Sequence, residues 1–92
     1  MTTNAVCIPI HPDGMVDTLQ HEAVESLTRA GGELVLDFSS VLKIDAGAAR
    51  ALEELAGLAD RSSVKVVLRG VNIGIYRALK LLKLAPRFSF LS

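Results

Sequence analysis

The apolar positions of two segments alternate with polar ones, which is the period of a β-strand with one buried face. In the first segment, "ELVLDF" at 33–38, the side chains of Leu34, Leu36 and Phe38 share one face. In the second, "SSVKVVLRG" at 62–70, three aliphatic residues share a face and the opposite face carries two basic residues. Because of this charge, we expect the opposite face to be half exposed to water.

Short apolar runs near the two ends of the chain predict two more strands. The run "AVCIPI" at 5–10 contains Pro9 and precedes the turn sequence "HPDG", and proline is tolerated in an edge strand. Cys7 lies inside this run, and we interpret it as a small core side chain rather than a reactive thiol. The run "FSF" at 88–90 predicts a final short strand.

Apolar residues spaced three or four apart predict three helices between these strands. The first is expected to run from Asp17, a candidate N-cap, to the glycine pair at 31–32. The second follows a candidate N-cap at Asp45, and the third follows Asn72 and runs to about Lys83. The predicted core positions are Leu19, Ala23, Leu27 and Ala30 in the first helix, Ala48, Leu52, Leu55 and Ala59 in the second, and Ile75, Ala78, Leu79 and Leu82 in the third.

Strands and helices alternate along the whole chain, which is typical of an α/β fold with helices packed on a sheet. We expect one domain, residues 1–92, because typical domains contain about 50 to 250 residues. No apolar run approaches the roughly 18 residues that span a bilayer, and a single cysteine, Cys7, can form no intramolecular disulfide. We therefore expect a cytoplasmic protein that does not insert into a membrane.

Charge is distributed unevenly along the chain, although its formal net value is zero. All ten acidic residues lie at or before Asp60, together with only three basic ones, and the seven remaining basic residues lie from Arg61 onward. This asymmetry indicates either an oriented partner or pairing between the two halves within the fold. Sequence halves are not spatial halves, so both interpretations stay open.

The residue types that catalyse reactions or bind metals do not form a recognisable site in this sequence. The two imidazoles, His11 and His21, and the thiol of Cys7 have neither metal-ligand spacing nor a partner that would complete a nucleophile. His21 is expected on the solvent side of the first helix. No glycine-rich phosphate loop is present, and Asp45 at a helix start would repel phosphate. We therefore expect no catalytic residue, no cofactor and no metal.

The residues at the start of the second helix have very small side chains. Asp45 is followed by Ala46, Gly47, Ala48 and Ala49, and small residues let another backbone approach closely. Such a surface can dock a protein partner. The same residues could equally pack against neighbouring elements of their own chain, and the residue types leave both interpretations open.

The third helix carries a basic face, formed by Arg77, Lys80 and Lys83. A basic amphipathic helix can contact anionic lipid, nucleic acid or an acidic protein, and it can also be an ordinary solvated face. Aromatic residues do not interleave with these cations, so the sequence does not favour nucleic-acid binding. Tyr76 and Leu84 are expected nearer the basic side of this helix than its core side.

The stretches "LVLDFSSVLKIDAGAARALEELAGLA", "VKVVLRGVN" and "IYRALKLLKL" resemble the STAS domain, a family named for sulfate transporters and anti-sigma-factor antagonists. The likeness covers residues 17–92. Its most specific part is a strand ending in Asp-Phe-Ser, an apolar connection, and then Ile-Asp with small residues that open a helix. The resemblance implies a STAS-like fold, with a mixed sheet of four to five strands and about three helices, and a non-enzymatic protein-interaction module.

In the anti-sigma-factor antagonists of this family, the loop and helix start that match 44–49 bind a kinase-type anti-sigma factor, and a serine in an Asp-Ser-Ser-Gly pattern accepts phosphate. By resemblance, Asp45 matches the aspartate, Ala46 the first serine, Gly47 the acceptor and Ala48 the glycine. Gly47 has no hydroxyl, so the resemblance implies docking without the usual serine phospho-switch. The residues expected to bind the partner are Ser39, Ser40, Ile44, Asp45, Ala46, Gly47, Ala48 and Arg50.

The resemblance leaves two bacterial functions open. In the first, the protein takes part in signalling and transcription regulation as a partner of an anti-sigma-factor kinase. In the second, it is similar to the STAS subunit of lipid-asymmetry (phospholipid) ABC transporters, which binds the transporter ATPase. The ending "GVNIGIYRALKLLKLAP" looks like the second group, and the basic surface at Arg77, Lys80 and Lys83 would suit a membrane-proximal complex. Either function requires a protein partner and no nucleic acid.

Overall fold

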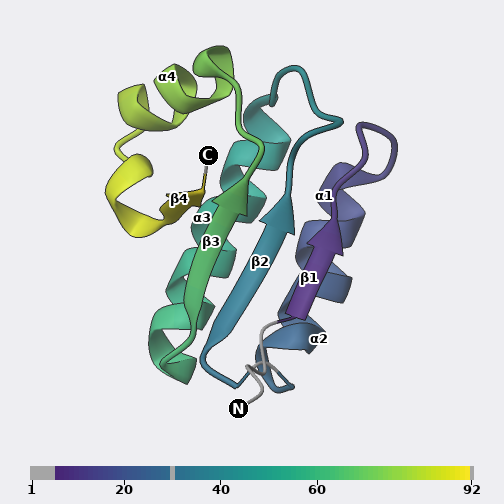
Figure 1. Ribbon diagram of the computed structural model, residues 1–92, viewed down its shortest axis with the longest axis vertical. Helices are drawn as coiled ribbons and strands as arrows, with labels where there is room; N and C mark the ends of the chain where they lie inside the picture. The colour runs from purple at the N-terminus through teal and green to yellow at the C-terminus, as the bar shows by residue number, and fades with distance from the viewer. Residues whose placement is uncertain (1–5, 30, 92) are drawn as a thin grey trace.

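The computed structural model describes residues 6–29 and 31–91 and contains one four-stranded sheet with helices between the strands (Figure 1). The strands lie in chain order, and each pairing between them is parallel. The elements are β1 (Val6–Pro9), α1 (Met15–Asp17), the π-helical segment η1 (Thr18–Glu22), α2 (Ala23–Leu27), β2 (Glu33–Asp37), α3 (Ala46–Ser62), β3 (Lys65–Arg69), α4 (Ile73–Leu81), the 3-10 segment η2 (Ala85–Arg87) and β4 (Ser89–Leu91). The predicted α/β fold is confirmed.

The core lies between the sheet and the helices α1, α2 and α3, which cover one face of it (Figure 1). Leu34, Leu36 and Phe38 are fully buried on this face, as their alternation predicts. The strand register places Leu36 between Ile8 of β1 and Leu68 of β3, both also buried. Full burial of such an aliphatic side chain contributes about 1.5–3 kcal/mol, so this row of residues fixes the register of the three strands.

The helix α3 packs its predicted face on the sheet, with Ala48, Leu52, Leu55 and Ala59 all buried. It ends with Ser63 in the left-handed conformation, at φ 58°. The backbone N–H of the next residue, Val64, then donates to the carbonyl of Ala59 at 2.9 Å, which is the pattern of a Schellman motif. This ending turns the chain directly into β3.

The N-cap of the first helix lies three residues earlier than predicted, so the assignment of Asp17 to that position is wrong. Gly14 occupies the cap position with φ 74°, and the helix starts at Met15 and continues through η1 into α2. Met15 is buried, and this burial favours a helical turn ahead of Asp17. The Asp17 carboxylate instead lies 3.0 Å from Nδ1 of His21 on the exposed side. Leu19, Ala23 and Leu27 are buried as predicted, whereas Ala30 lies outside the described residues.

Cys7 is exposed, which corrects the prediction that it is a core side chain. Because side chains alternate along β1, burial of Ile8 on the helix-covered face directs Cys7 to the opposite face. In the described part of the chain no helix covers that face (Figure 1). The exposure of Cys7 therefore follows from which residues of β1 face the core. A short run of apolar residues does not show which of its two faces is buried.

The helix α4 buries Ile75 and Leu79 as predicted but leaves Leu82 54% exposed. Leu84, which was expected nearer the basic side, is buried instead. The cause is a left-handed residue, Lys83 at φ 62°, after which the N–H of Leu84 donates to the carbonyl of Leu79 at 2.8 Å. The chain thus reverses at the helix end and returns Leu84 to the core.

Candidate functional site

The loop at 39–45 lies at the carboxyl ends of β2 and β3 and is fixed at its entrance by backbone hydrogen bonds. The N–H of Phe38 donates to the carbonyl of Arg69 at 2.7 Å, which extends the pairing of β2 with β3 by one residue. The N–H of Val41 donates to the carbonyl of Phe38 at 2.9 Å, and the Val41 side chain is buried. The entrance of the loop is therefore anchored in the core.

Asp37 and Ser39 close the turn that leads into this loop. The N–H of Ser39 donates to Oδ1 of Asp37 at 3.0 Å. Hydrogen bonding by the Ser39 hydroxyl, and by this N–H, lowers the pKa of Asp37, because both bonds favour the charged carboxylate. The turn-capping chemistry of Ser39 is thus used within the chain, although both Ser39 and Ser40 remain exposed.

A second element, the start of α4, holds the middle of the loop. The side-chain Nδ2 of Asn72 donates to the carbonyl of Leu42 at 2.9 Å, while its Oδ1 accepts from the N–H of Ile75 at 2.8 Å. Asn72 therefore caps α4, as predicted, and at the same time ties the loop to that helix. Gly70 lets the chain after β3 pass close to the backbone of Ser39, since a Cβ at this position would lie 2.9 Å from the Cα of Ser39.

The end of the loop is fixed by Asp45, which caps α3 as predicted. Its backbone is extended, with φ −100° and ψ −177°, and its Oδ1 accepts from the N–H of Ala48 at 2.8 Å. The carbonyl of Asp45 also accepts the N–H of Ala49 at 2.9 Å. The carboxylate therefore lies at the N-terminus of α3, where it accepts from an otherwise free N–H and interacts favourably with the helix dipole.

The small residues after Asp45 divide into two pairs with different environments. Ala48 and Ala49 are buried, so they pack against their own chain. Ala46 and Gly47 are exposed and present a turn of helix with a single methyl group. Packing within the chain is thus confirmed for Ala48 and Ala49, and docking at the exposed pair stays a prediction.

The backbone at Gly47 is that of an ordinary helix and has room for a side chain. A Cβ built there would lie 3.5 Å from Oδ1 of Asp45 and 3.6 Å from Cγ2 of Val16, both of which are normal contact distances. Its φ is not in the left-handed region that favours glycine. Neither crowding nor backbone strain therefore requires glycine at this position.

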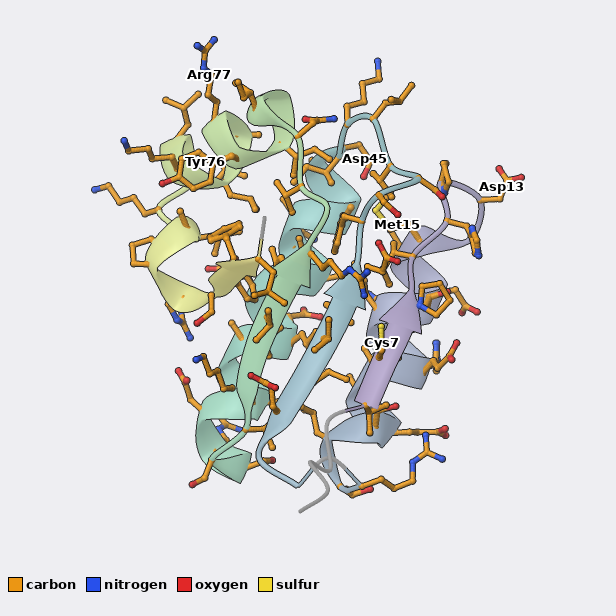
Figure 2. All side chains as sticks on the ribbon, in the orientation of Figure 1. Cys7, Asp13, Met15, Asp45, Tyr76 and Arg77 are labelled. Atoms are coloured by element: carbon orange, nitrogen blue, oxygen red, sulfur yellow. The ribbon has the colours of Figure 1, made fainter. Side chains whose placement is uncertain are left out.

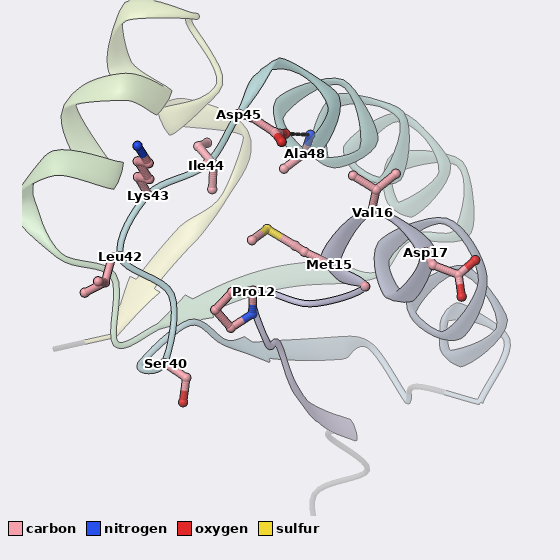
Figure 3. Close-up of a pocket in the computed structure, with 11 residues that line it drawn as sticks. Pro12, Met15, Val16, Asp17, Ser40, Leu42, Lys43, Ile44, Asp45 and Ala48 are labelled. Carbon is pink, nitrogen blue, oxygen red and sulfur yellow. Dashed lines mark hydrogen bonds between the residues drawn. The ribbon is translucent and has the colours of Figure 1, made fainter.

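A groove of about 530 Å³ lies beside this turn, between the segment at 12–17 and the loop at 40–45 (Figure 3). Figure 3 shows Met15 extending between Pro12 and Ile44 into this groove. Its apolar lining comes from Pro12, Met15, Val16, Leu42, Ile44 and Ala48. The groove is mainly apolar and has a polar rim, which is the form that accepts an apolar anchor side chain of a partner protein.

A smaller hollow of about 240 Å³ lies against α3 near the end of α4. Ala46, Arg50 and Leu84 are among its lining residues. Ala46 thus borders this hollow, and Ala48, two residues later, borders the larger groove. The first turn of α3 forms a smooth ridge between two depressions.

The structure brings most of the predicted partner-binding residues together at this ridge and loop. Ser40, Ile44, Asp45 and Ala48 line the groove, whereas Arg50 lies at the smaller hollow. Ser39 belongs to the turn before the loop. The predicted basic residues are exposed on a separate element, at and just beyond α4; they are Arg77, Lys80 and Lys83.

The groove includes residues that were not singled out from the sequence. Pro12, Met15 and Val16 form its second wall, although they are about 30 residues from the loop in sequence. They reach the loop because parallel pairing of β1 with β2 brings the carboxyl ends of both strands to one edge of the sheet. An apolar pair, Met15 and Val16, directly after the turn "HPDG" was the available signal.

Within residues 6–29 and 31–91, no three side chains of the metal-ligating types are grouped so that they could hold an ion. His21 is engaged by Asp17, and both side chains are exposed. No helix in this described part of the chain is both long and apolar enough to cross a bilayer.

Both the sequence and the fold of the chain are similar to those of known proteins. The sequence model of the STAS domain matches residues 13–91. Among curated proteins, none matches the sequence. A solved structure described as the NMR structure of the protein TM1081 shares the fold with a TM-score of 0.79 at 15% sequence identity, over 100% of this chain and 77% of that one.

Proposed function

The chain belongs to the STAS domain family, and from that premise we propose that it docks a kinase-type anti-sigma factor, or a related signalling partner, through the loop and helix start at 44–49. STAS domains are generally non-catalytic interaction modules. The observation that supports the location is the exposed pair Ala46 and Gly47, which forms a ridge bare of functional groups between two hollows.

The proposed docking uses shape and apolar contact rather than charge. The ridge lets a partner backbone come close, and the groove beside it receives an apolar anchor. The Asp45 carboxylate is already bonded to the N–H of Ala48 at 2.8 Å, so its role is to hold the helix start in place. Gly47 has no hydroxyl, and the proposed interaction therefore operates without phosphorylation at this turn.

Substitutions at Gly47 test the proposal, because the site accepts a side chain without strain. We expect Gly47→Ala to bind the partner nearly as wild type does, Gly47→Gln to bind more weakly because of its bulk, and Gly47→Glu to bind most weakly. A contact at the centre of an interface is typically worth 2 kcal/mol or more, so the expected loss for Gly47→Glu is about 30-fold or more. An acidic residue near a helix start favours the helix, and the variant should stay folded.

The experiment is capture of a partner from lysate of the source organism by wild type and by the three variants, followed by titration calorimetry with the purified partner. Retention of full affinity by a folded Gly47→Glu variant would refute docking at this turn. A Gly47→Ser variant adds a test of the kinase assignment, because a kinase-type partner with ATP should phosphorylate this variant and not the wild type. The phosphate is detected by mass spectrometry.

A second candidate partner is the ATPase of a lipid-asymmetry ABC transporter, and the exposed cations of Arg77, Lys80 and Lys83 favour it. For this partner, Lys80→Glu combined with Lys83→Glu should weaken capture at low ionic strength. Capture of a transporter ATPase that depends on these lysines would replace the anti-sigma factor as the partner. Unaltered capture by the double variant would remove this candidate.

A further inference from the structure

The large apolar side chains that the structure leaves exposed are concentrated at one end of the molecule. Six of them are exposed in the described residues, and five belong to α4 or to the chain that follows it. The sixth, Leu42, lies in the loop that Asn72 ties to the start of α4. The exposed residues are Leu42, Ile73, Tyr76, Leu81, Leu82 and Leu91.

The outer face of α4 combines two of these residues with cations. On a helical wheel, one side of α4 carries Ile73, Arg77, Lys80 and Leu81. Ile73 is 70% exposed and Leu81 is 84% exposed. Ile75 and Leu79 are buried on the opposite side, so the exposed aliphatic residues are additional to the face that holds α4 on the domain.

The two cations of this face, and Lys83 just beyond the end of the helix, form no ion pair in the described part of the structure. No acidic residue occurs from Arg61 to the end of the sequence. In the described part of the structure, the salt bridge that involves this basic segment joins Arg87 to Asp60 at 3.1 Å, and it leaves Arg77, Lys80 and Lys83 free of ion pairs. Pairing between the halves of the chain, one of the two explanations of their opposite charge, therefore does not neutralise this face.

The position of α4 exposes this face outward. The helix lies beyond the carboxyl ends of the strands, at one end of the domain (Figure 1), and Arg77 projects away from the sheet (Figure 2). Its aliphatic side chains alternate with cations and do not form one continuous apolar surface. A hollow there is lined by Arg77, Lys80 and Leu81.

We propose that this outer face of α4 adsorbs to the surface of an anionic phospholipid bilayer. Phosphate headgroups provide the negative charge that Arg77, Lys80 and Lys83 lack in the fold, and the tips of Ile73 and Leu81 enter the acyl boundary between them. A bilayer is fluid and needs no fixed pocket, which suits a face whose apolar groups are separated by cations. A folded acidic protein would need complementary pockets for these separate side chains. Adsorption of this kind involves no membrane-spanning helix.

The test is co-sedimentation of the protein with vesicles of phosphatidylcholine alone or mixed with phosphatidylglycerol. We expect binding only to the mixed vesicles and release at high ionic strength. Each basic residue at an anionic surface is worth about 1 kcal/mol, or about fivefold in affinity, so Lys80→Glu with Lys83→Glu should weaken binding by at least about 25-fold.

A matched control is Arg61→Glu with Lys65→Glu, which makes the same change in net charge at exposed positions where α3 ends and β3 begins. We expect this control to bind within about threefold of wild type, because its charges lie at the other end of β3, beyond a Debye length of about 10 Å. A loss equal to that of the α4 variant would overturn the assignment to α4. Ile73→Ser with Leu81→Ser should reduce binding about tenfold or more, and unchanged binding would refute insertion of these side chains.

Three results separate this proposal from docking at 44–49. Gly47→Glu should bind the mixed vesicles as wild type does, so either proposal can fail without the other. Absence of wild-type binding to the mixed vesicles at low ionic strength would overturn adsorption. Capture of an acidic protein through Lys80 and Lys83, without vesicle binding, would assign the face to that protein instead.

Discussion

Gly70 is the position where a single added methyl group should disturb the loop most. Its φ is 73°, in the left-handed region, and it follows directly after β3. A Cβ there would lie 2.9 Å from both Cα and Cβ of Ser39 and 3.0 Å from its backbone nitrogen. Because two of these atoms belong to the backbone, Gly70→Ala cannot be relieved by rotating a side chain.

The expected cost of Gly70→Ala has two parts. The left-handed conformation costs a residue with a Cβ roughly 1–2 kcal/mol. Crowding against the Ser39 backbone adds about 1–3 kcal/mol, the usual range for an overpacked site. Together they destabilise the protein by about 2–5 kcal/mol, out of a total stability expected to be roughly 5–15 kcal/mol for a domain of this kind.

The matched control is Gly57→Ala, the same substitution in the interior of α3. A Cβ at Gly57 meets no atom within 4 Å, and alanine is favoured over glycine in a helix by about 0.8–1 kcal/mol. Urea denaturation followed by circular dichroism measures both variants, and the midpoint should fall by at least about 1 M for Gly70→Ala and rise for Gly57→Ala. A Gly70→Ala midpoint within experimental error of wild type would show that the loop does not depend on this close approach.

Two further predictions concern the residues that hold the loop. Hydrogen bonding by Ser39 lowers the pKa of Asp37 in the folded state, so its contribution to stability is present above the unfolded value of about 3.9 and is lost as the pH falls through the folded value. Asp37→Asn should therefore lose less stability than wild type as the pH falls below about 4 in urea titrations, and parallel pH profiles would contradict this. Asn72→Ala should cost about 1–2 kcal/mol and increase hydrogen exchange at the N–H of Ile75, which it leaves without an acceptor; unchanged protection of that N–H would refute the cap.

The sequence predicted those parts of the fold and site that depend on local chemistry. Asp45 and Asn72 both cap helices, since an N-cap needs only a short polar side chain two or three residues before the N–H that it accepts. The strand at 33–38 follows from alternation alone, which also assigned its buried face. Burial of Ala48 was predicted from its helical spacing with Leu52 and Leu55, whereas burial of Ala49 and exposure of Gly47 could not be assigned from residue types.

The parts that the sequence did not predict depend on contacts between distant segments. The first helix starts at Met15 because that side chain is buried in the core, which outweighs the N-cap preference of Asp17. Leu84 rather than Leu82 enters the core because Lys83 adopts a left-handed conformation, which few lysines do. The sequence could not place the second wall of the groove, because its residues reach the loop only through the parallel pairing of β1 with β2.

Asn72 connects the two surfaces that we propose for binding. Its amide holds the carbonyl of Leu42 in the docking loop, while its carbonyl oxygen caps α4, the helix that carries the basic face. The two surfaces are therefore joined through the hydrogen bonds of one side chain. A partner that displaces the loop would have to break the bond to Leu42 or move the start of α4 with it, so occupation of one surface is physically linked to the position of the other.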